Sequence, residues 1–280
     1  RPRLQRNGRP GKTCASTAQD TQNAIVGMLH IALLDASLGT PHAKRNFQRE
    51  IDATLTVFDV NKGELPPPIN SDNVLRQTGI SDPFDAAVIS GSQSSVYHDE
   101  AWIARLSTWV RSAIASGLPI FGVCWGHQLL AEVLGGRVEG GAYELGYTEV
   151  EQVHSDPFFE GVENPCTVFA THSDHVVEMP PEATVLARNE ASIQSFRHEN
   201  VFTTQFHPEY DLRTAKAMIE SKDLPAADIQ QALDTCTAEN VRKAQDVKRV
   251  FDNFLSYVAG VSDRTPIAND PPTAERPSQP

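Results

Sequence analysis

Short apolar runs rich in β-branched residues alternate with amphipathic stretches along the first half of this chain. The apolar runs, each a predicted strand, cover residues 29–34, 55–60, 86–90 and 118–123. Amphipathic stretches near 41–51 and at 99–116 predict helices between the strands. Parallel strands need a crossover connection, which is usually a helix. This alternation therefore predicts a doubly wound α/β domain with a mostly parallel sheet flanked by helices.

The second half of the chain continues the pattern with shorter elements. Further strands are predicted at residues 148–153, 167–171, 184–188 and 201–206, and residues 211–259 return to helix. The chain has no internal repeat, so we expect one flavodoxin-like domain over residues 28–260. The basic leader at 1–27 and the Pro-rich tail at 261–280 are expected to be disordered. Because Met28 directly precedes the first apolar run, we hypothesise that translation starts there.

Composition excludes several classes of function. The 280 residues include 24 Lys and Arg and 36 Asp and Glu, which gives a formal net charge of -12. Because nucleic acids are polyanions, this negative charge argues against a nucleic-acid partner. The four cysteines are widely spaced without a C-x-x-C pair, which predicts free thiols in a reducing cytoplasm and no zinc site. The longest apolar stretch, residues 24–34, is about half the ~20 residues that a membrane span needs. We therefore expect a cytoplasmic protein that has no membrane segment.

A G-x-C-x-G motif stands where the predicted strand 118–123 turns into a helix that ends at Gly135. In this motif Cys124 lies between Gly122 and Gly126, in the arrangement of the G-x-S-x-G turn of hydrolases. Such a turn exposes the central side chain at the carboxyl edge of the sheet, where α/β proteins bind ligands. The positive end of the following helix favours a thiolate. Cys124 is therefore a candidate nucleophile, with a buried core cysteine as the equally weighted alternative.

A second group of polar residues follows the predicted strand 201–206. If this segment stays extended, His207 and Glu209 point to the same side, although Pro208 perturbs the geometry. A nucleophilic cysteine needs a base, and the base needs an acceptor that orients it. Cys124, His207 and Glu209 supply these three groups in chain order, whereas a lone histidine is usually structural.

Four segments in this order resemble class I (triad) glutamine amidotransferases. They are residues 121–128 with the cysteine motif, 143–147, 171–177 with the sequence T-H-S-D-H-V-V, and 205–209 with the His/Glu motif. Within the family, the chain is most similar to the glutaminase subunit or domain of GMP synthases and to stand-alone amidotransferase-like proteins. The similarity extends from about residue 31 to residue 209. It implies the family's α/β fold and an enzyme without a cofactor.

The resemblance also implies roles for individual residues. Cys124 would attack the γ-carbonyl of L-glutamine, His207 would transfer protons and Glu209 would orient His207. The oxyanion would be held by the backbone N–H of Trp125 and by an amide of the loop with Gly91 and Ser92. Further substrate contacts are expected from Gln128, Thr171, Ser173 and Asp174. For Gln128, an exposed helix position is the equally weighted alternative.

The oxyanion loop departs from the family, because Ser-Gly-Ser-Gln stands at 90–93 where GMP synthase-like glutaminases have Ser-Gly-Gly-Pro. Ser92 lacks the conformational freedom of glycine, and this variant resembles stand-alone proteins, some of which cleave γ-glutamyl peptides.

Three functions stay open. The first is a glutaminase that passes ammonia to a separate ATP-dependent synthetase, such as the other subunit of a two-chain GMP synthase. The others are a γ-glutamyl hydrolase or peptidase, and a catalytically silent regulatory protein.

Three polar residues of the T-H-S-D-H segment raise a metal site as an alternative. His172, Asp174 and His175 could join His207 and Glu209 as ligands, because histidine and carboxylate often bind metals. A metal would also bind the thiolate and occupy the base that the triad needs. We therefore expect no metal.

Overall fold

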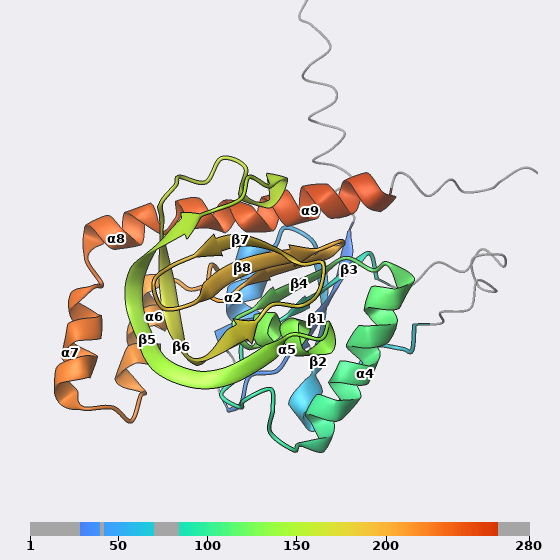
Figure 1. The fold of residues 1–280 in the computed structure, drawn as a ribbon, viewed down its shortest axis with the longest axis horizontal. Coiled ribbons are helices and arrows are strands. Elements are labelled where there is room, and N and C mark those ends of the chain that lie inside the picture. The colour runs from blue at the N-terminus through green and yellow to red at the C-terminus, as the bar shows by residue number, and fades with distance from the viewer. Residues whose placement is uncertain (1–28, 40–41, 70–83, 263–280) are drawn as a thin grey trace, which may run out of the picture.

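The computed structural model describes residues 29–39, 42–69 and 84–262 (Figure 1). The predictions for the leader, for a start at Met28 and for residues 263–280 lie outside the described residues. The last helix ends at Ser262, so the first two residues of the predicted tail are helical.

Within the described residues, one nine-stranded sheet has the order β2-β1-β3-β4-β9-β8-β7-β5-β6. The strands are β1 (His30–Asp35), β2 (Thr54–Asp59), β3 (Ala86–Ile89), β4 (Ile120–Val123), β5 (Arg137–Gln152), β6 (Cys166–Glu178), β7 (Thr184–Arg188), β8 (Ile193–His198) and β9 (Val201–Thr204). The first five strands in this order pair in parallel, and the last four add antiparallel pairs. The prediction of an α/β sheet that is mostly parallel at its centre is confirmed.

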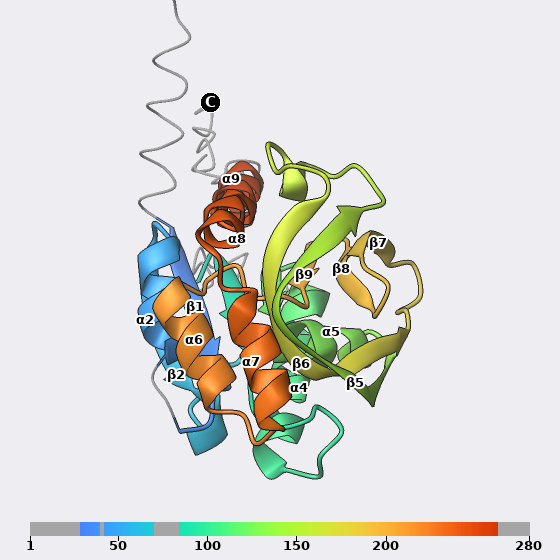
Figure 2. The ribbon, with the colours of Figure 1, turned by 90° about the vertical axis from the view of Figure 1, so that its left-hand side faces the viewer.

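Helices cover both faces of the parallel part of the sheet (Figures 1 and 2). The helices are α2 (His42–Glu50), α4 (Ala101–Ser116), α5 (Trp125–Val133), α6 (Leu212–Glu220), α7 (Ala226–Asp234), α8 (Ala238–Lys243) and α9 (Arg249–Ser262). Apolar side chains of α2 and α9 pack on one face, and those of α4 and α5 pack on the other. Trp102 and Trp109 of α4 are both buried. The parallel strands are therefore buried on both faces, which explains why they are continuous apolar runs.

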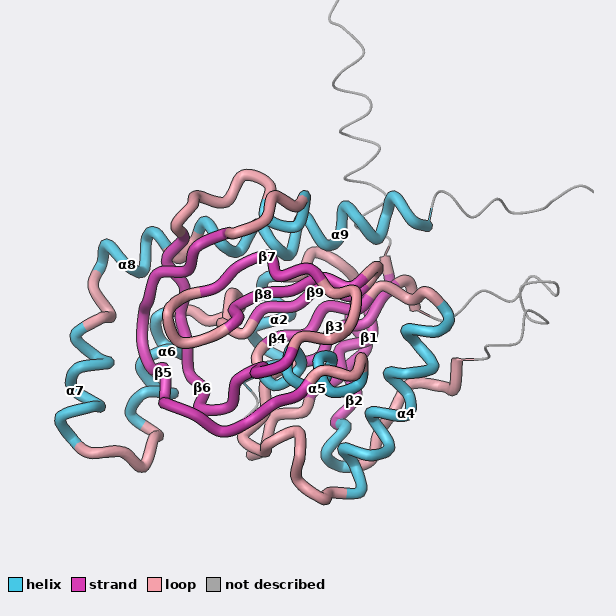
Figure 3. The backbone as a smooth tube through the Cα atoms, in the orientation of Figure 1, coloured by secondary structure: helices cyan, strands magenta, loops and turns pink. Residues whose placement is uncertain are grey.

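The long hairpin of β5 and β6 differs from the prediction of short strands in this region. The two strands pair antiparallel along most of their length and form the outer curve of the sheet (Figure 3). The predicted segments 148–153 and 167–171 are only parts of them, and β8 was not predicted. Residues 139–143 in the first half of β5 are exposed, so this part of the strand lacks the apolar alternation that marks a half-buried strand.

The hairpin is covered on one side by α6 and α7. Tyr147 of β5 and Phe169 of β6 pack with Ala215, Ile219 and Ala232 in a separate apolar cluster. This places the end of α6 close to the carboxyl edge of the parallel strands, where Cys124 lies. None of the described helices is long and apolar enough to cross a membrane.

Candidate active site

The turn from β4 into α5 holds Cys124 in a strained backbone conformation, with φ 53° and ψ −104°. Both flanking glycines are required by close packing. A Cβ at Gly122 would lie 2.5 Å from Leu130 Cδ1, and one at Gly126 would lie 2.5 Å from the carbonyl oxygen of Ile89. Strain at a non-glycine residue is typical of functional sites. The motif thus forms the sharp strand-to-helix turn that the sequence predicts. The Cys124 side chain is only 5% exposed, so the prediction of an exposed side chain at this turn is wrong.

The register of β4 and β9 brings the two halves of the predicted triad together. Val123 is paired with Thr204, so the chain after each strand leaves the sheet at the same edge. His207 Nδ1 lies 2.8 Å from Glu209 Oε1, and both side chains are almost fully buried. The predicted strand 201–206 ends at Thr204, and a turn at residues 207–210 lets these side chains meet. Their contact therefore comes from a turn and not from strand alternation.

The His207 ring is held between three groups. It stacks on Tyr210 with ring centroids 4.2 Å apart. Burial by itself would lower the pKa of His207, but the Glu209 carboxylate and a hydrogen-bonding contact with Cys124 raise it from 6.5 to about 10. Burial, together with Glu209, raises the pKa of the Tyr210 phenol, which therefore stays neutral. His207 is therefore protonated near pH 7 and lies beside Cys124.

A groove opens over Cys124 and His207, with an empty volume of about 470 Å³ that includes its open mouth. Its lining residues are Ser37, His42, Ala43, Gly91, Ser92, Gln93, Cys124, Thr171, His207, Glu209, Tyr210, Met218 and Lys222. The floor consists of the predicted triad. The other lining residues come from the loops after β1 and β3, from α2, from β6, from the turn after β9 and from the end of α6. The site lies at the carboxyl ends of parallel strands, where open α/β sheets bind ligands.

The predicted oxyanion residues lie around Cys124. Trp125 is the first residue of α5, and its buried indole packs on Trp102. Gly91 lies against His207, since a Cβ at this position would be 2.9 Å from His207 Cε1. The Ser92 hydroxyl oxygen accepts the backbone N–H of Ser94 at 3.2 Å. Gly91 and Trp125 therefore lie beside Cys124, and a role of these residues in holding an oxyanion stays a prediction.

The loop after β3 is also tied to the loop after β1. Gln93 Oε1 accepts the backbone N–H of Leu38 at 2.6 Å. This glutamine, expected to be proline in GMP synthase-like glutaminases, thus provides a side-chain tether between the two loops.

Of the other residues predicted to contact the substrate, only one lines the groove. Thr171 lines the groove, with its hydroxyl 3.3 Å from the Tyr143 hydroxyl. Gln128 is 3% exposed, so the alternative of an exposed helix position is wrong, and its amide donates to the carbonyl of Asp174 at 2.9 Å. Ser173 and Asp174 are half-buried and lie outside the groove lining. A direct substrate contact of these last three residues stays a prediction.

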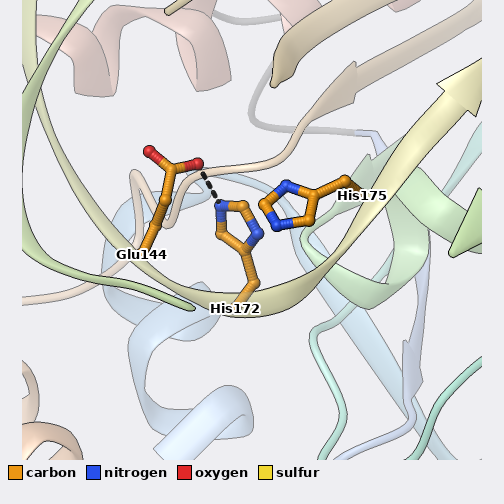
Figure 4. Close-up of side chains that lie close together, drawn as sticks. All are labelled: Glu144, His172 and His175. Carbon is orange, nitrogen blue, oxygen red and sulfur yellow. Dashed lines mark ion pairs between the residues drawn. The ribbon is translucent and has the colours of Figure 1, made fainter. Parts of the chain in front are cut away.

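One group among the described residues has the composition of a metal site: Glu144, His172 and His175 (Figure 4). It overlaps the predicted alternative at His172 and His175 but includes neither His207 nor Glu209. His172 Nε2 lies 3.0 Å from Glu144 Oε2, and His175 Nε2 faces the carbonyl of Ala142 at 2.8 Å. Burial lowers the pKa of His172, so its imidazole is neutral near pH 7.

The Glu144 carboxylate already has several protein donors. It accepts hydrogen bonds from Asn189 Nδ2 at 2.6 Å, from Gln194 Nε2 at 2.9 Å and from the Ser192 hydroxyl at 3.2 Å. These donors come from β8 and the turn before it. The group therefore joins the hairpin of β5 and β6 to the hairpin of β7 and β8 by hydrogen bonds, and a metal would have to compete with them.

Sequence reasoning missed several groove residues. They are Ser37, His42, Ala43, Tyr210, Met218 and Lys222. Tyr210 directly follows the His/Glu motif, so its position was a usable signal. Met218 and Lys222 come from the α6 region, and no local pattern relates them to Cys124.

The fold and the site geometry together define an open, doubly wound α/β protein with a cysteine on its strand-to-helix turn and a His–Glu pair beside it. A sequence model of the family described as glutamine amidotransferase class-I matches residues 43–224. The chain belongs to this family. The predictions of the family and of a glutamine amidotransferase enzyme are confirmed.

Individual relatives agree with this assignment. The chain is 39% identical over 179 residues to a GMP synthase [glutamine-hydrolyzing] of Pyrobaculum aerophilum, which covers 64% of this chain and 28% of that protein. It is 42% identical over 97 residues to one subunit of the GMP synthase [glutamine-hydrolyzing] of Methanopyrus kandleri, which covers 33% of this chain and 52% of that protein. The matches thus span about a quarter to a half of these relatives.

A crystal structure of a glutamine amidotransferase from Thermotoga maritima has the same fold. It superposes with a TM-score of 0.65 at 21% identity, covering 82% of this chain and 98% of that chain. This likeness independently confirms the predicted fold class.

Proposed function

We propose that this protein hydrolyses the γ-amide of L-glutamine through Cys124, His207 and Glu209. The observation that carries the proposal is the position of the His207 ring, 2.8 Å from Glu209 on one side and in contact with Cys124, on the floor of an open groove. This is the arrangement of nucleophile, base and orienting acceptor that covalent catalysis requires.

In the first half of the reaction, the Cys124 thiolate attacks the γ-carbonyl carbon and forms a C–S bond. The resulting oxyanion collapses, the C–N bond breaks, and the leaving nitrogen takes the proton of His207 and departs as ammonia. A γ-glutamyl thioester remains on Cys124. Glu209 holds Nδ1 of His207, so that Nε2 carries the proton that is transferred.

In the second half, neutral His207 removes a proton from water as the water oxygen attacks the thioester. Collapse of this intermediate breaks the C–S bond, releases glutamate and restores the thiolate beside a protonated His207. The backbone N–H of Trp125 and an amide of the Gly91–Ser92 loop would hold the oxyanion in both halves, helped by the positive end of α5.

The ammonia is proposed to pass to a separate ATP-dependent synthetase of the GMP synthase type in the cytoplasm. The support is the similarity to the Methanopyrus kandleri protein, which is by its name one subunit of a glutamine-hydrolysing GMP synthase. The site residues of the acceptor reaction would then lie on the partner.

A γ-glutamyl hydrolase is a second candidate. Ser92 replaces a glycine in the oxyanion loop, and Gln93 tethers that loop to Leu38. A loop that is tied in place has less need of a partner to order it, which favours an enzyme that acts alone.

Two reactions measured side by side test these proposals. Ammonia release from glutamine and glutamate release from γ-glutamyl dipeptides are followed with and without a candidate synthetase. Glutamine turnover that rises with the synthetase supports the first proposal, and dipeptide cleavage without it supports the second. Cys124→Ala should abolish both activities, whereas Cys236→Ala, at a free thiol outside the groove, should retain them. Undiminished turnover by Cys124→Ala would refute the mechanism.

A further inference from the structure

Lys222 lies just after α6, and its side chain lines the groove that contains Cys124. The side chain is half-buried, and its ammonium lies 5.6 Å from the centre of the Tyr143 ring. In the described part of the chain, Lys62, Lys243 and Lys248 each pair with a carboxylate, whereas Lys44, Lys216 and Lys222 form no ion pair. Of these three, Lys44 and Lys216 are exposed and only Lys222 is half-buried. A partly desolvated ammonium without an anionic partner is available to a ligand.

The rest of the groove offers Lys222 no carboxylate. Glu209 is the single acidic residue among the described lining residues, and it is engaged with His207. The Tyr143 ring face holds the ammonium by a cation–π contact, and Tyr143 in turn lies 3.3 Å from the hydroxyl of Thr171. The ammonium is thus kept beside the groove and open to an anion.

We propose that Lys222 binds the free α-carboxylate of the γ-glutamyl substrate. This inference rests on the proposed function. When the γ-carbonyl is at Cys124, the α-carboxylate is at the other end of a short carbon chain and needs a cation within the groove. Lys222 is the single lysine or arginine among the described residues that line the groove. Glutamine and γ-glutamyl peptides share this carboxylate, so Lys222 selects for the γ-glutamyl group as a class and against simple primary amides.

Steady-state kinetics test this role. Because the α-carboxylate does not react, its ion pair is present in the ground state and in the transition state, and its loss raises KM while kcat changes little. Lys222→Met should raise KM for glutamine about tenfold, the effect of losing one charge-assisted hydrogen bond. Lys222→Arg should recover part of this loss. Lys216→Met removes the same charge from the exposed side of α6 and should leave KM unchanged.

A change of substrate separates carboxylate binding from a general packing effect. The α-amide of glutamine has no carboxylate, so wild type should have a high KM for it. Lys222→Met should not raise this KM further. An equal rise in KM for both substrates, or no rise for glutamine, would overturn the proposal.

Alkylation of Cys124 tests Lys222 without any turnover. Iodoacetate carries a carboxylate and iodoacetamide does not, so the ratio of their rates at Cys124 reports the cation in the groove. Lys222→Met should lower this ratio several-fold, and Lys216→Met should not. A lowered ratio in a protein that cleaves no γ-glutamyl compound would overturn the proposed function and keep the anion site. An unchanged ratio would likewise overturn the role of Lys222.

Discussion

Replacing Gly91 by alanine should disturb both the stability of the fold and the position of His207. A methyl group at this position would lie 2.9 Å from His207 Cε1 and 3.6 Å from Cys124 Cβ. Carbon atoms pack best at about 3.5–4.0 Å, so the imidazole ring would have to retreat by about 0.6 Å. The ring has little room to do so, because it stacks on Tyr210 and is bonded to Glu209.

The expected size of the effect follows from this overlap. Overpacking of a well-packed site costs about 1–3 kcal/mol, so the free energy of unfolding should fall by that amount. A displacement of about 1 Å in a catalytic group costs about a hundredfold in rate. About half of that displacement at His207 predicts a decrease of about tenfold in kcat for glutamine hydrolysis.

Urea unfolding and glutamine hydrolysis are measured for Gly91→Ala and for Gly260→Ala as the matched control. A Cβ at Gly260, in α9, would meet no atom within 4 Å. Alanine there should stabilise the helix by about 0.5–1 kcal/mol and leave kcat unchanged.

Two results would refute the reasoning about Gly91. One is a Gly91→Ala protein as stable as wild type, which would mean that the loop and His207 are not packed together in solution. The other is a stable protein with unchanged kcat, which would mean that the position of His207 does not limit the reaction.

Three further substitutions have defined outcomes. Glu209→Gln should lower the free energy of unfolding by about 2 kcal/mol at pH 6. The pKa of His207 rises from 6.5 in the unfolded chain to about 10 in the fold, so the stabilisation by its ion pair with Glu209 is complete below about pH 6.5. In urea titrations, the stability difference between Glu209→Gln and wild type should therefore shrink between pH 6.5 and 10. A difference that stays constant over this range would contradict the assignment. Arg49 donates to the backbone carbonyl of Glu209 at 2.6 Å and to the Asp211 carboxylate at 2.9 Å. Arg49→Met removes both donors and should lower kcat about tenfold in the hydrolysis assay, with KM little changed. Full activity would show that the segment of Glu209 and Asp211 keeps its position without Arg49. Phe121→Ala should cost about 3–5 kcal/mol in urea unfolding because its ring is fully buried, and a loss below about 1 kcal/mol would indicate a core that refills the space.

The loop after β3 bears more directly than the triad on the choice between the two proposed functions. The triad residues would serve a partner-dependent glutaminase and an independent hydrolase equally well. If the tether from Gln93 to Leu38 keeps the loop ordered, the enzyme should depend less on a synthetase. Gln93→Pro, which introduces the residue of GMP synthase-like glutaminases, should increase the stimulation of glutamine turnover by an added synthetase.

Much of the fold could be predicted because its main elements have local signatures. The parallel strands are buried on both faces and are therefore continuous apolar runs, and α4 has an apolar stripe at helical spacing. The hairpin of β5 and β6 could not be predicted at its full length. In its exposed part, residues 139 and 140 pair with β6 through the backbone and residues 141–143 lie at an irregularity of the pairing, and neither feature has a signature in the side chains of one strand.

The sequence alone determined the sharp turn at Cys124, since glycines at 122 and 126 allow a close approach that other residues would block. It also placed His207 and Glu209 after a strand of the same sheet. Only the tertiary structure decided that a turn joins these two side chains, that Gln128 is buried and that Lys222 faces the groove. Local conformation depends on neighbouring residues, so short sequence patterns predict it. Contacts between distant segments depend on strand register and helix packing, which arise from the whole chain.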